Sequence, residues 1–282
     1  MDPIKIFVKI CLIFVCTEQL KPQIIKPIEK ILVNEKYENR NGLITPLRSF
    51  PNSIMPPSEE QYPMTVRSTS GPDSLKEAIV HALQPYLAPK GFLYLPRWEQ
   101  YRKPTPSGFQ SVIVALAPYE DLSLLEVHLG IRQDSVENLA YPFTNGLMGF
   151  QDNSMTLVTP LAKLHGHAFQ RFEVRQPADG TRAAQEILDQ LDKGGLRFLD
   201  KYSRLEEMCS LFNRHPKHPL PLVHNQINRC LRGLVLARLN QRNDFEELGA
   251  IYRDRLQVLR APEVAVQKFD RLRNYLRTYS VN

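Results

Sequence analysis

The tripeptide His165-Gly166-His167 is the part of the sequence whose residue types and spacing best suit metal chemistry. On an extended segment, residues i and i+2 face the same way, so two imidazoles could bind one divalent cation. Such a site needs at least a third ligand, and His128 or Glu173 could serve only if the fold brought them close. No carboxylate follows at a spacing typical of a metal site. We therefore interpret His165 and His167 as solvated turn residues and expect neither a metal nor another cofactor.

Residues that could act as nucleophiles or bind phosphate are present without the motifs that activate them. Cys209 and Cys230 lie in helical patterns, where a buried apolar thiol is the simpler interpretation. His215, His218 and His224 surround a proline-rich loop, with no cysteine or carboxylate at ligand spacing. The sequence contains no phosphate-binding glycine loop and no nucleophile elbow. We therefore expect no catalytic residues. Of three possible functions, a catalytic one ranks last.

Basic residues are concentrated in the C-terminal third. The chain has a formal net charge of +6, and residues 197–282 contain 16 basic and 9 acidic residues, a net charge of +7. At about 100° per residue, Arg229 and Arg238 of one predicted helix lie on opposite sides and form no single stripe. In the last predicted helix, Arg271, Arg273 and Arg277 lie on or beside one face. This face could bind nucleic-acid phosphates, although a solvated helix surface explains it equally well.

The elements that must position these residues start with a strand pair. Residues 109–117 and 122–132 read as two strands joined by the turn Pro118-Tyr119-Glu120-Asp121. The second strand alternates apolar and polar residues, a period of two that places one row on a core. In the first strand, residues 112–116 form a continuous apolar run. Such a run is typical of a central strand that is covered on both faces.

Further elements complete an α+β pattern. A helix is predicted at Ser74–Leu87, followed by a first strand at Leu93–Arg102. Two more strands are predicted at Met155–Leu164 and His167–Arg175. Another helix is expected to begin at Asp179-Gly180 and to end at Gly194-Gly195. The sequence therefore predicts an antiparallel sheet of four to five strands with flanking helices.

The remainder of the chain is predicted to be helical. Apolar periodicity indicates helices at Leu222–Asn240, Phe245–Leu259 and Pro262–Tyr279. The first two resemble a single unit of a helical repeat, and stacked repeats need at least about three units. We therefore expect an antiparallel helical hairpin within a helical C-terminal region.

The N-terminal segment differs from the rest of the chain. Residues 4–15 are apolar, but 12 residues are too few to span a bilayer, and Lys5 and Lys9 interrupt them. Nine of the 22 prolines lie in residues 1–73, which disfavours long regular elements there. We expect a flexible or extended N-terminal extension over 1–73, an α+β sheet domain over 74–196 and a helical region over 197–282. The expected location is the cytoplasm, and export or anchoring through residues 4–16 is the alternative.

One resemblance concerns the start of the sheet domain. The helix Ser74–Leu87, the turn Pro89-Lys90-Gly91-Phe92 and the strands that follow resemble a family of uncharacterised bacterial domains. The resemblance covers roughly residues 74–135. Some domains of that family are encoded near toxin and immunity genes, which implies protein binding and provides no catalytic residues. We therefore expect a non-catalytic protein-binding protein, immunity-type or adaptor, with an unknown protein partner. The alternative is nucleic-acid association through the basic C-terminal helices.

Overall fold

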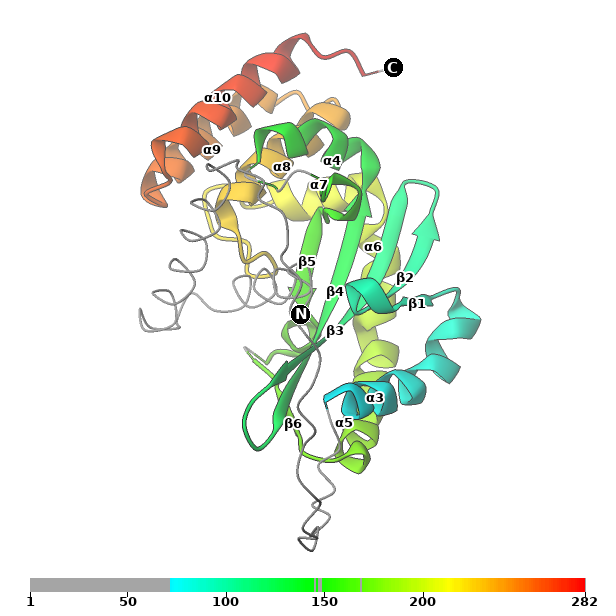
Figure 1. Cartoon of the computed structure of the whole chain (residues 1–282). Coiled ribbons are helices and arrows are strands. Elements are labelled where there is room, and N and C mark those ends of the chain that lie inside the picture. Colours follow the sequence, from blue (N-terminus) through cyan, green and yellow to red (C-terminus); the bar gives the residue numbers. More distant parts are fainter. Residues whose placement is uncertain (1–71, 145, 147–148, 168, 282) are drawn as a thin grey trace, which may run out of the picture. The chain divides into compact units, whose positions relative to one another are not determined.

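The structure is a computed structural model that describes residues 72–144, 146, 149–167 and 169–281 (Figure 1). The expected extension therefore lies almost entirely outside the described residues, as does the apolar segment 4–15. Within the described ranges, no helix is both long enough and apolar enough to cross a membrane.

The described residues form one antiparallel sheet of six strands, in the order β1-β2-β3-β4-β5, with β6 also paired to β4. This confirms the predicted fold class. The strands are β1 (Leu93–Leu95), β2 (Gln100–Thr105), β3 (Gly108–Pro118), β4 (Ser123–Gln133), β5 (Leu157–Pro160) and β6 (Phe172–Val174). The long pair β3–β4 coincides with the strand pair predicted from the sequence. In its register Val112 lies opposite Leu129, and Val114 lies opposite Val127.

The other predicted strands are shorter in the structure than in the sequence analysis. The strand predicted at Leu93–Arg102 is interrupted by a 3-10 turn at Pro96–Trp98. The strand predicted at Met155–Leu164 ends at Pro160, after which Leu161–His165 form a 3-10 helix. Both interruptions occur at a proline, which lacks the N–H that a continuing strand would use. Of the strand predicted at His167–Arg175, only β6, Phe172–Val174, forms.

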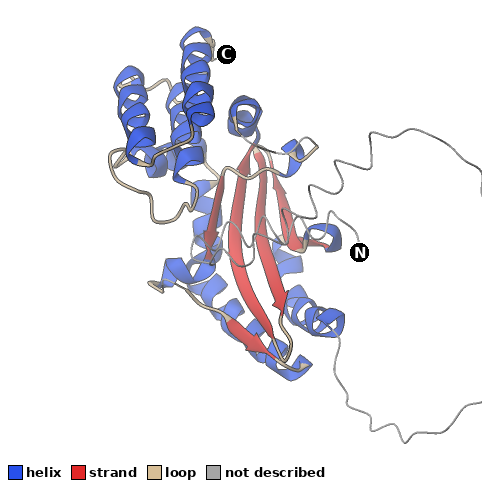
Figure 2. Cartoon of the chain, turned by 60° about the vertical axis from the view of Figure 1, so that its left-hand side comes forward, coloured by secondary structure: helices blue, strands red, loops and turns tan. Residues whose placement is uncertain are grey.

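Helices α3 (Pro72–Leu87), α5 (Pro177–Gln190) and α6 (Leu196–Tyr202) cover one face of the sheet (Figures 1 and 2). The buried row of α3 contains Leu75, Ile79, Leu83 and Leu87. The Tyr101 hydroxyl of β2 donates a hydrogen bond to the carbonyl of Val80 at 2.7 Å. The expected helix stop at Gly194-Gly195 is wrong, because a π-helical turn over Leu191–Gly195 carries the chain into α6.

The C-terminal region consists of α7 (Leu205–Asn213), α8 (Gln226–Leu239), α9 (Phe245–Val258) and α10 (Glu263–Thr278). Helix α8 is its buried centre. A Cβ atom at Gly233 would lie 2.6 Å from the Tyr252 hydroxyl, so the absence of a side chain lets α8 and α9 approach closely. These helices and the sheet contribute to the same hydrophobic core.

A buried ion pair connects the sheet to the C-terminal helices. Glu137 lies in α4 (Asp134–Ala140), directly after β4, and Arg232 lies in α8. The guanidinium donates two hydrogen bonds to the carboxylate, at 2.7 and 2.9 Å. Burial alone would raise the pKa of Glu137, but Arg232 holds that pKa below its ordinary value. The pair therefore remains charged in the interior.

Candidate functional site

The histidine pair does not have the geometry that a two-histidine chelate on a strand requires. His165 ends a 3-10 helix, and Gly166 follows it at a φ of 80°, so the segment is not extended. The His165 Nε2 atom lies 3.0 Å from the carbonyl oxygen of Gln190, while His167 is exposed. Among the described residues, no group of three His, Cys, Asp or Glu side chains could hold a metal ion.

The two late cysteines are buried and free, as expected from their helical pattern. Burial raises the pKa of the Cys230 thiol to about 12. The same cause raises the pKa of Cys209. Because the thiolate is the reactive form, these side chains serve as packing groups.

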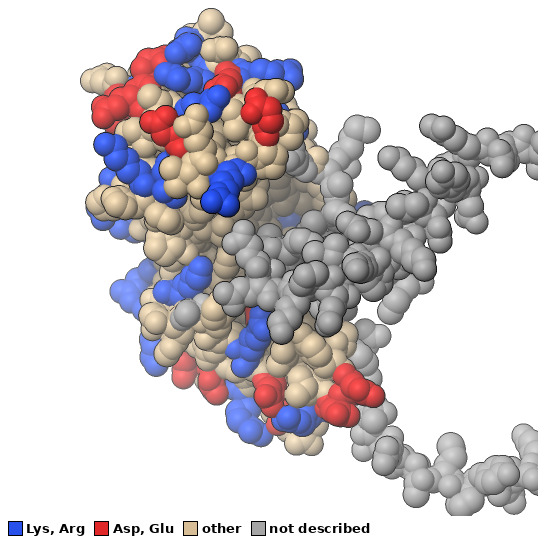
Figure 3. Space-filling view, turned by 90° about the vertical axis from the view of Figure 1, so that its left-hand side faces the viewer, with Lys and Arg blue, Asp and Glu red and all other residues tan. Residues whose placement is uncertain are grey.

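The arginines of α8 are used inside the protein. Arg229 donates hydrogen bonds to backbone carbonyls, Arg232 binds Glu137, and Arg238 donates to the carbonyl of Tyr279 at 3.0 Å. They contribute to the basic charge of the C-terminal third without forming a basic surface. Figure 3 shows basic and acidic side chains interspersed at the end of the molecule that carries the C-terminal helices.

The three arginines of α10 are separated by their contacts. Arg273 and Arg277 both bind Glu246 of α9, at 2.7 and 2.8 Å. Arg271 is exposed. Two of the three candidate phosphate ligands are therefore partly neutralised, and they connect two helices.

The triple variant Arg271→Ala/Arg273→Ala/Arg277→Ala tests the nucleic-acid alternative. If α10 binds phosphates, affinity should fall for all sequences, because neutralised phosphates release counterions. The slope of log affinity against log salt should become shallower by about 0.9 for each lost contact with duplex DNA. Filter binding at several salt concentrations measures both effects. Unchanged affinity and slope would remove these arginines as a nucleic-acid site.

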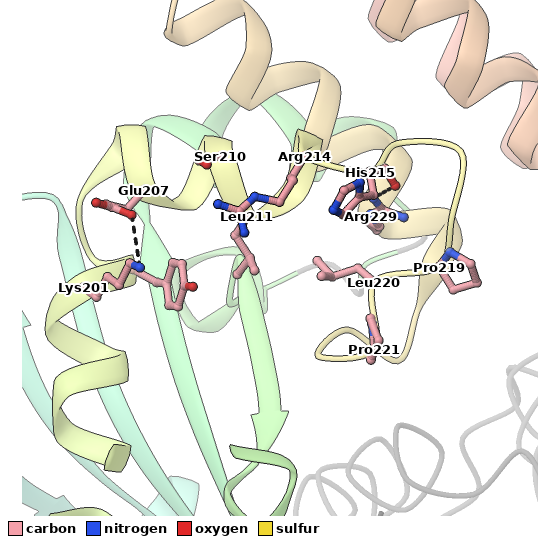
Figure 4. A pocket seen from close by; sticks show the side chains of 11 residues that line it. Lys201, Glu207, Ser210, Leu211, Arg214, His215, Pro219, Leu220, Pro221 and Arg229 are labelled. Atoms are coloured by element: carbon pink, nitrogen blue, oxygen red, sulfur yellow. Dashed lines mark hydrogen bonds and ion pairs between the residues drawn. The ribbon is translucent and has the colours of Figure 1, made fainter. Parts of the chain in front are cut away.

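A groove beside α7 is a candidate binding site (Figure 4). It lies between the end of α6, helix α7 and the loop that precedes α8, and its volume is about 230 Å³. Leu211 and Leu220 supply apolar surface, and Pro219 and Pro221 border them. The prolines restrict the conformation of this irregular loop, since each fixes its own φ angle.

Positive charge predominates around this groove. Lys201 lies 3.7 Å from Glu207, which also binds Arg204 at 3.5 Å. Within the described residues, the exposed side chain of Arg214 forms no ion pair. The cations therefore outnumber the single carboxylate that lines the groove.

Arg229 adds a buried cation to the same groove. It is only 3% exposed, and its guanidinium donates to the carbonyls of Phe212 at 2.8 Å, His215 at 3.1 Å and His218. Its charge meets no carboxylate among the described residues. Burial consequently lowers the pKa of Arg229. The groove can thus attract a negatively charged group next to an apolar one.

A second charged cluster lies on the sheet. Buried His128 of β4 lies 3.3 Å from Glu126, which also accepts a hydrogen bond from Arg171. Burial alone would raise the pKa of Glu126, but its bonds to His128 and Arg171 lower it to about 2. Glu126 is therefore ionised at all pH values well above 2, and its role is structural.

The lowered pKa of Glu126 leads to a prediction about stability in acid. Its pKa in the folded protein, about 2, lies below its ordinary value of 4.5, so its stabilising contribution is complete above pH 4.5 and is lost as the pH falls toward 2. Glu126→Gln should remove a contribution on the order of 2 kcal/mol at neutral pH and should flatten the pH dependence of unfolding in that window. Urea unfolding at a series of pH values measures this. The control Glu173→Gln, at an exposed position of β6, should keep the wild-type slope. An unchanged slope for Glu126→Gln would contradict the assignment.

Comparison of the chain with protein-family models, with curated proteins and with solved structures gives no match. The residues of the groove must therefore be interpreted from their geometry. His215 and the proline-rich loop can be recognised in the sequence, whereas Leu211, Arg214 and Arg229 cannot be recognised there as their neighbours. The one signal that could have found them is the unusual density of prolines and cations between α7 and α8.

Proposed function

We propose that this protein is a non-catalytic protein-binding protein, of the immunity or adaptor type, and that the groove beside α7 binds its partner. The observation that carries the proposal is the combination of apolar surface at Leu211 and Leu220 with a surplus of cations. The partner segment that fits this combination carries an apolar side chain next to a carboxylate. Complementary charge would also accelerate the encounter and select among partners.

The size of the groove favours a protein segment over a metabolite. Small-molecule pockets usually occupy roughly 300–1,000 Å³, and this groove measures about 230 Å³. A side chain projecting from a partner surface needs less space than a complete cofactor. The rest of such an interface would lie on the surrounding surface of α7 and the proline-rich loop.

Nucleic-acid binding remains the alternative proposal, with less support. It would depend on Arg271, Arg273 and Arg277, two of which already bind Glu246. The proposed location is the cytoplasm, where buried free thiols such as Cys209 and Cys230 are ordinary.

Affinity capture from the source cell tests the proposal when it is combined with a charge-reversing variant. Ser210→Glu/Arg214→Glu changes two exposed positions that line the groove, one in α7 and one directly after it. Gln185→Glu/Arg182→Glu makes the same change in charge at exposed positions of α5. With nuclease present, the wild type and the α5 control should retain a protein partner that the groove variant loses.

Two results would contradict the proposal. One is a partner that the groove variant retains as well as the wild type does. The other is recovery of nucleic acid in the absence of nuclease, together with loss of every partner after nuclease treatment, which would favour the alternative.

A further inference from the structure

The sheet has a second face that its helices do not cover. Because side chains alternate along strands, Ile113 and Ala115 of β3 project opposite to the core row Val112, Val114 and Leu116. Their partners across the strand pair are His128 and Glu126 of β4. We call these four residues and Val158 of β5 the second face.

At one end of this face, described residues lie over the sheet. There, a Cβ atom at Gly130 would lie 2.3 Å from the Met155 sulfur, so the loop before β5 closes over Gly130. In the same area, Arg102 stacks on the Phe109 ring at 3.8 Å and binds Asn153. Figure 2 shows the long helices on the opposite side of the sheet, and no described helix crosses the side turned to the viewer.

The second face is apolar along β3. Ile113 is only 4% exposed, yet it is not part of the hydrophobic core that the helices complete. An open face of an antiparallel sheet is normally polar, whereas β3 is apolar on both sides. Contact with Ile113 and Ala115 would remove apolar surface from water, so apolar contact would contribute to holding an occupant of this face.

We propose that the apolar segment Ile4–Val15 of the same chain docks on the second face. The segment has 12 residues, so an extended segment is long enough to run along the half of β3 that contains Ile113 and Ala115. Alternate residues from Ile4 to Phe14 are apolar, while Lys5 and Lys9 belong to the other row. One row can therefore contact the sheet while both lysines remain in water.

The chain between the two sites is long enough. The 56 residues from Cys16 to Gly71 could span roughly 190 Å when fully extended. Docking within one chain also profits from a high effective concentration, which a separate partner lacks. This proposal replaces the expectation that residues 1–73 are only loosely attached.

Thiol protection in the full chain tests the proposal. In a Cys11→Ser/Cys16→Ser background, Ala115→Cys places a reactive thiol on the second face, and Gln185→Cys places one on the exposed side of α5. The buried thiols of Cys209 and Cys230 should stay unreactive. A maleimide should label the thiol of Ala115→Cys at least tenfold more slowly than that of Gln185→Cys.

A second variant assigns the protection to the segment. Ile6→Asp/Ile10→Asp places charges in its apolar row without altering the folded part, and labelling of Ala115→Cys should then accelerate at least tenfold. Labelling of Gln185→Cys should not change. Circular dichroism and thermal unfolding of each variant verify that the sheet remains folded.

Three outcomes would overturn the proposal. The first is equal labelling of Ala115→Cys and Gln185→Cys in the full chain. The second is protection of Ala115→Cys that persists in the Ile6→Asp/Ile10→Asp variant at every protein concentration. The third is protection that disappears on dilution, which would assign the second face to another copy of the chain.

Discussion

Replacing Glu137 by alanine should destabilise the protein by about 3–5 kcal/mol, because it leaves Arg232 as a buried charge without a partner. The Glu137 side chain is completely buried and that of Arg232 is 12% exposed, so water cannot replace the lost carboxylate without opening the junction between α4 and α8. Urea unfolding measures the change in free energy.

Two comparisons separate this effect from the loss of any acidic residue. Glu173→Ala removes an exposed partner of Arg175 and should cost less than about 1 kcal/mol. The double variant Glu137→Met/Arg232→Met removes both charges and should recover much of the loss, since apolar residues often replace a buried pair at little cost. If Glu137→Ala unfolds at the same urea concentration as Glu173→Ala, the buried pair has no structural role.

Arg229→Met is expected to have the second large effect, with a loss of about 3 kcal/mol or more. The change removes the donor for the carbonyls of Phe212, His215 and His218. A buried acceptor without a partner costs about 1–3 kcal/mol, and bonds to charged donors are among the stronger ones. Thermal unfolding should therefore begin at a lower temperature.

The matched control is Arg204→Met, because the Arg204 side chain is 66% exposed and binds only Glu207. Its effect should be small. Arg229→Met should also disorder the loop that forms one wall of the groove, so proteolysis between α7 and α8 should become faster. Equal proteolysis of wild type and Arg229→Met would show that the loop is held by other contacts.

The fold could be predicted from the sequence where periodicity is long and uninterrupted. Strands β3 and β4 have clear apolar rows, and the C-terminal helices have a regular repeat. Prediction failed where a local signal competes with packing. The glycines at 194 and 195 suggest a helix end. Gly195 is buried, however, and a Cβ atom there would lie 3.0 Å from the side chains of Leu161 and Leu191. Close packing at this position therefore lets the helix continue through it.

Neither the buried ion pair nor the candidate site could be predicted, because each is assembled from separate elements. Glu137 and Arg232 are 95 positions apart, and no local pattern indicates that they pair. The groove combines the end of α6, one side of α7 and the first turn of α8. The sequence identifies histidines and arginines only as residue types that could have a function. In the structure, most of these arginines form hydrogen bonds or ion pairs within the protein and so have structural roles.

The lengths of the edge strands also affect how the protein behaves at high concentration. The longest strands, β3 and β4, have the most backbone groups that could pair with another chain. Both strands lie inside the sheet, where these groups pair mainly with neighbouring strands. On one side, the sheet ends in β1, which has three residues. On the other, β5 and β6 share the edge of β4 with four and three residues, and β5 ends in a proline that cannot donate a hydrogen bond. Short, proline-terminated edges resist edge-to-edge association between molecules. A variant that lengthened β5 by replacing Pro160 with threonine would therefore be expected to aggregate more readily during refolding, even if its native stability were unchanged.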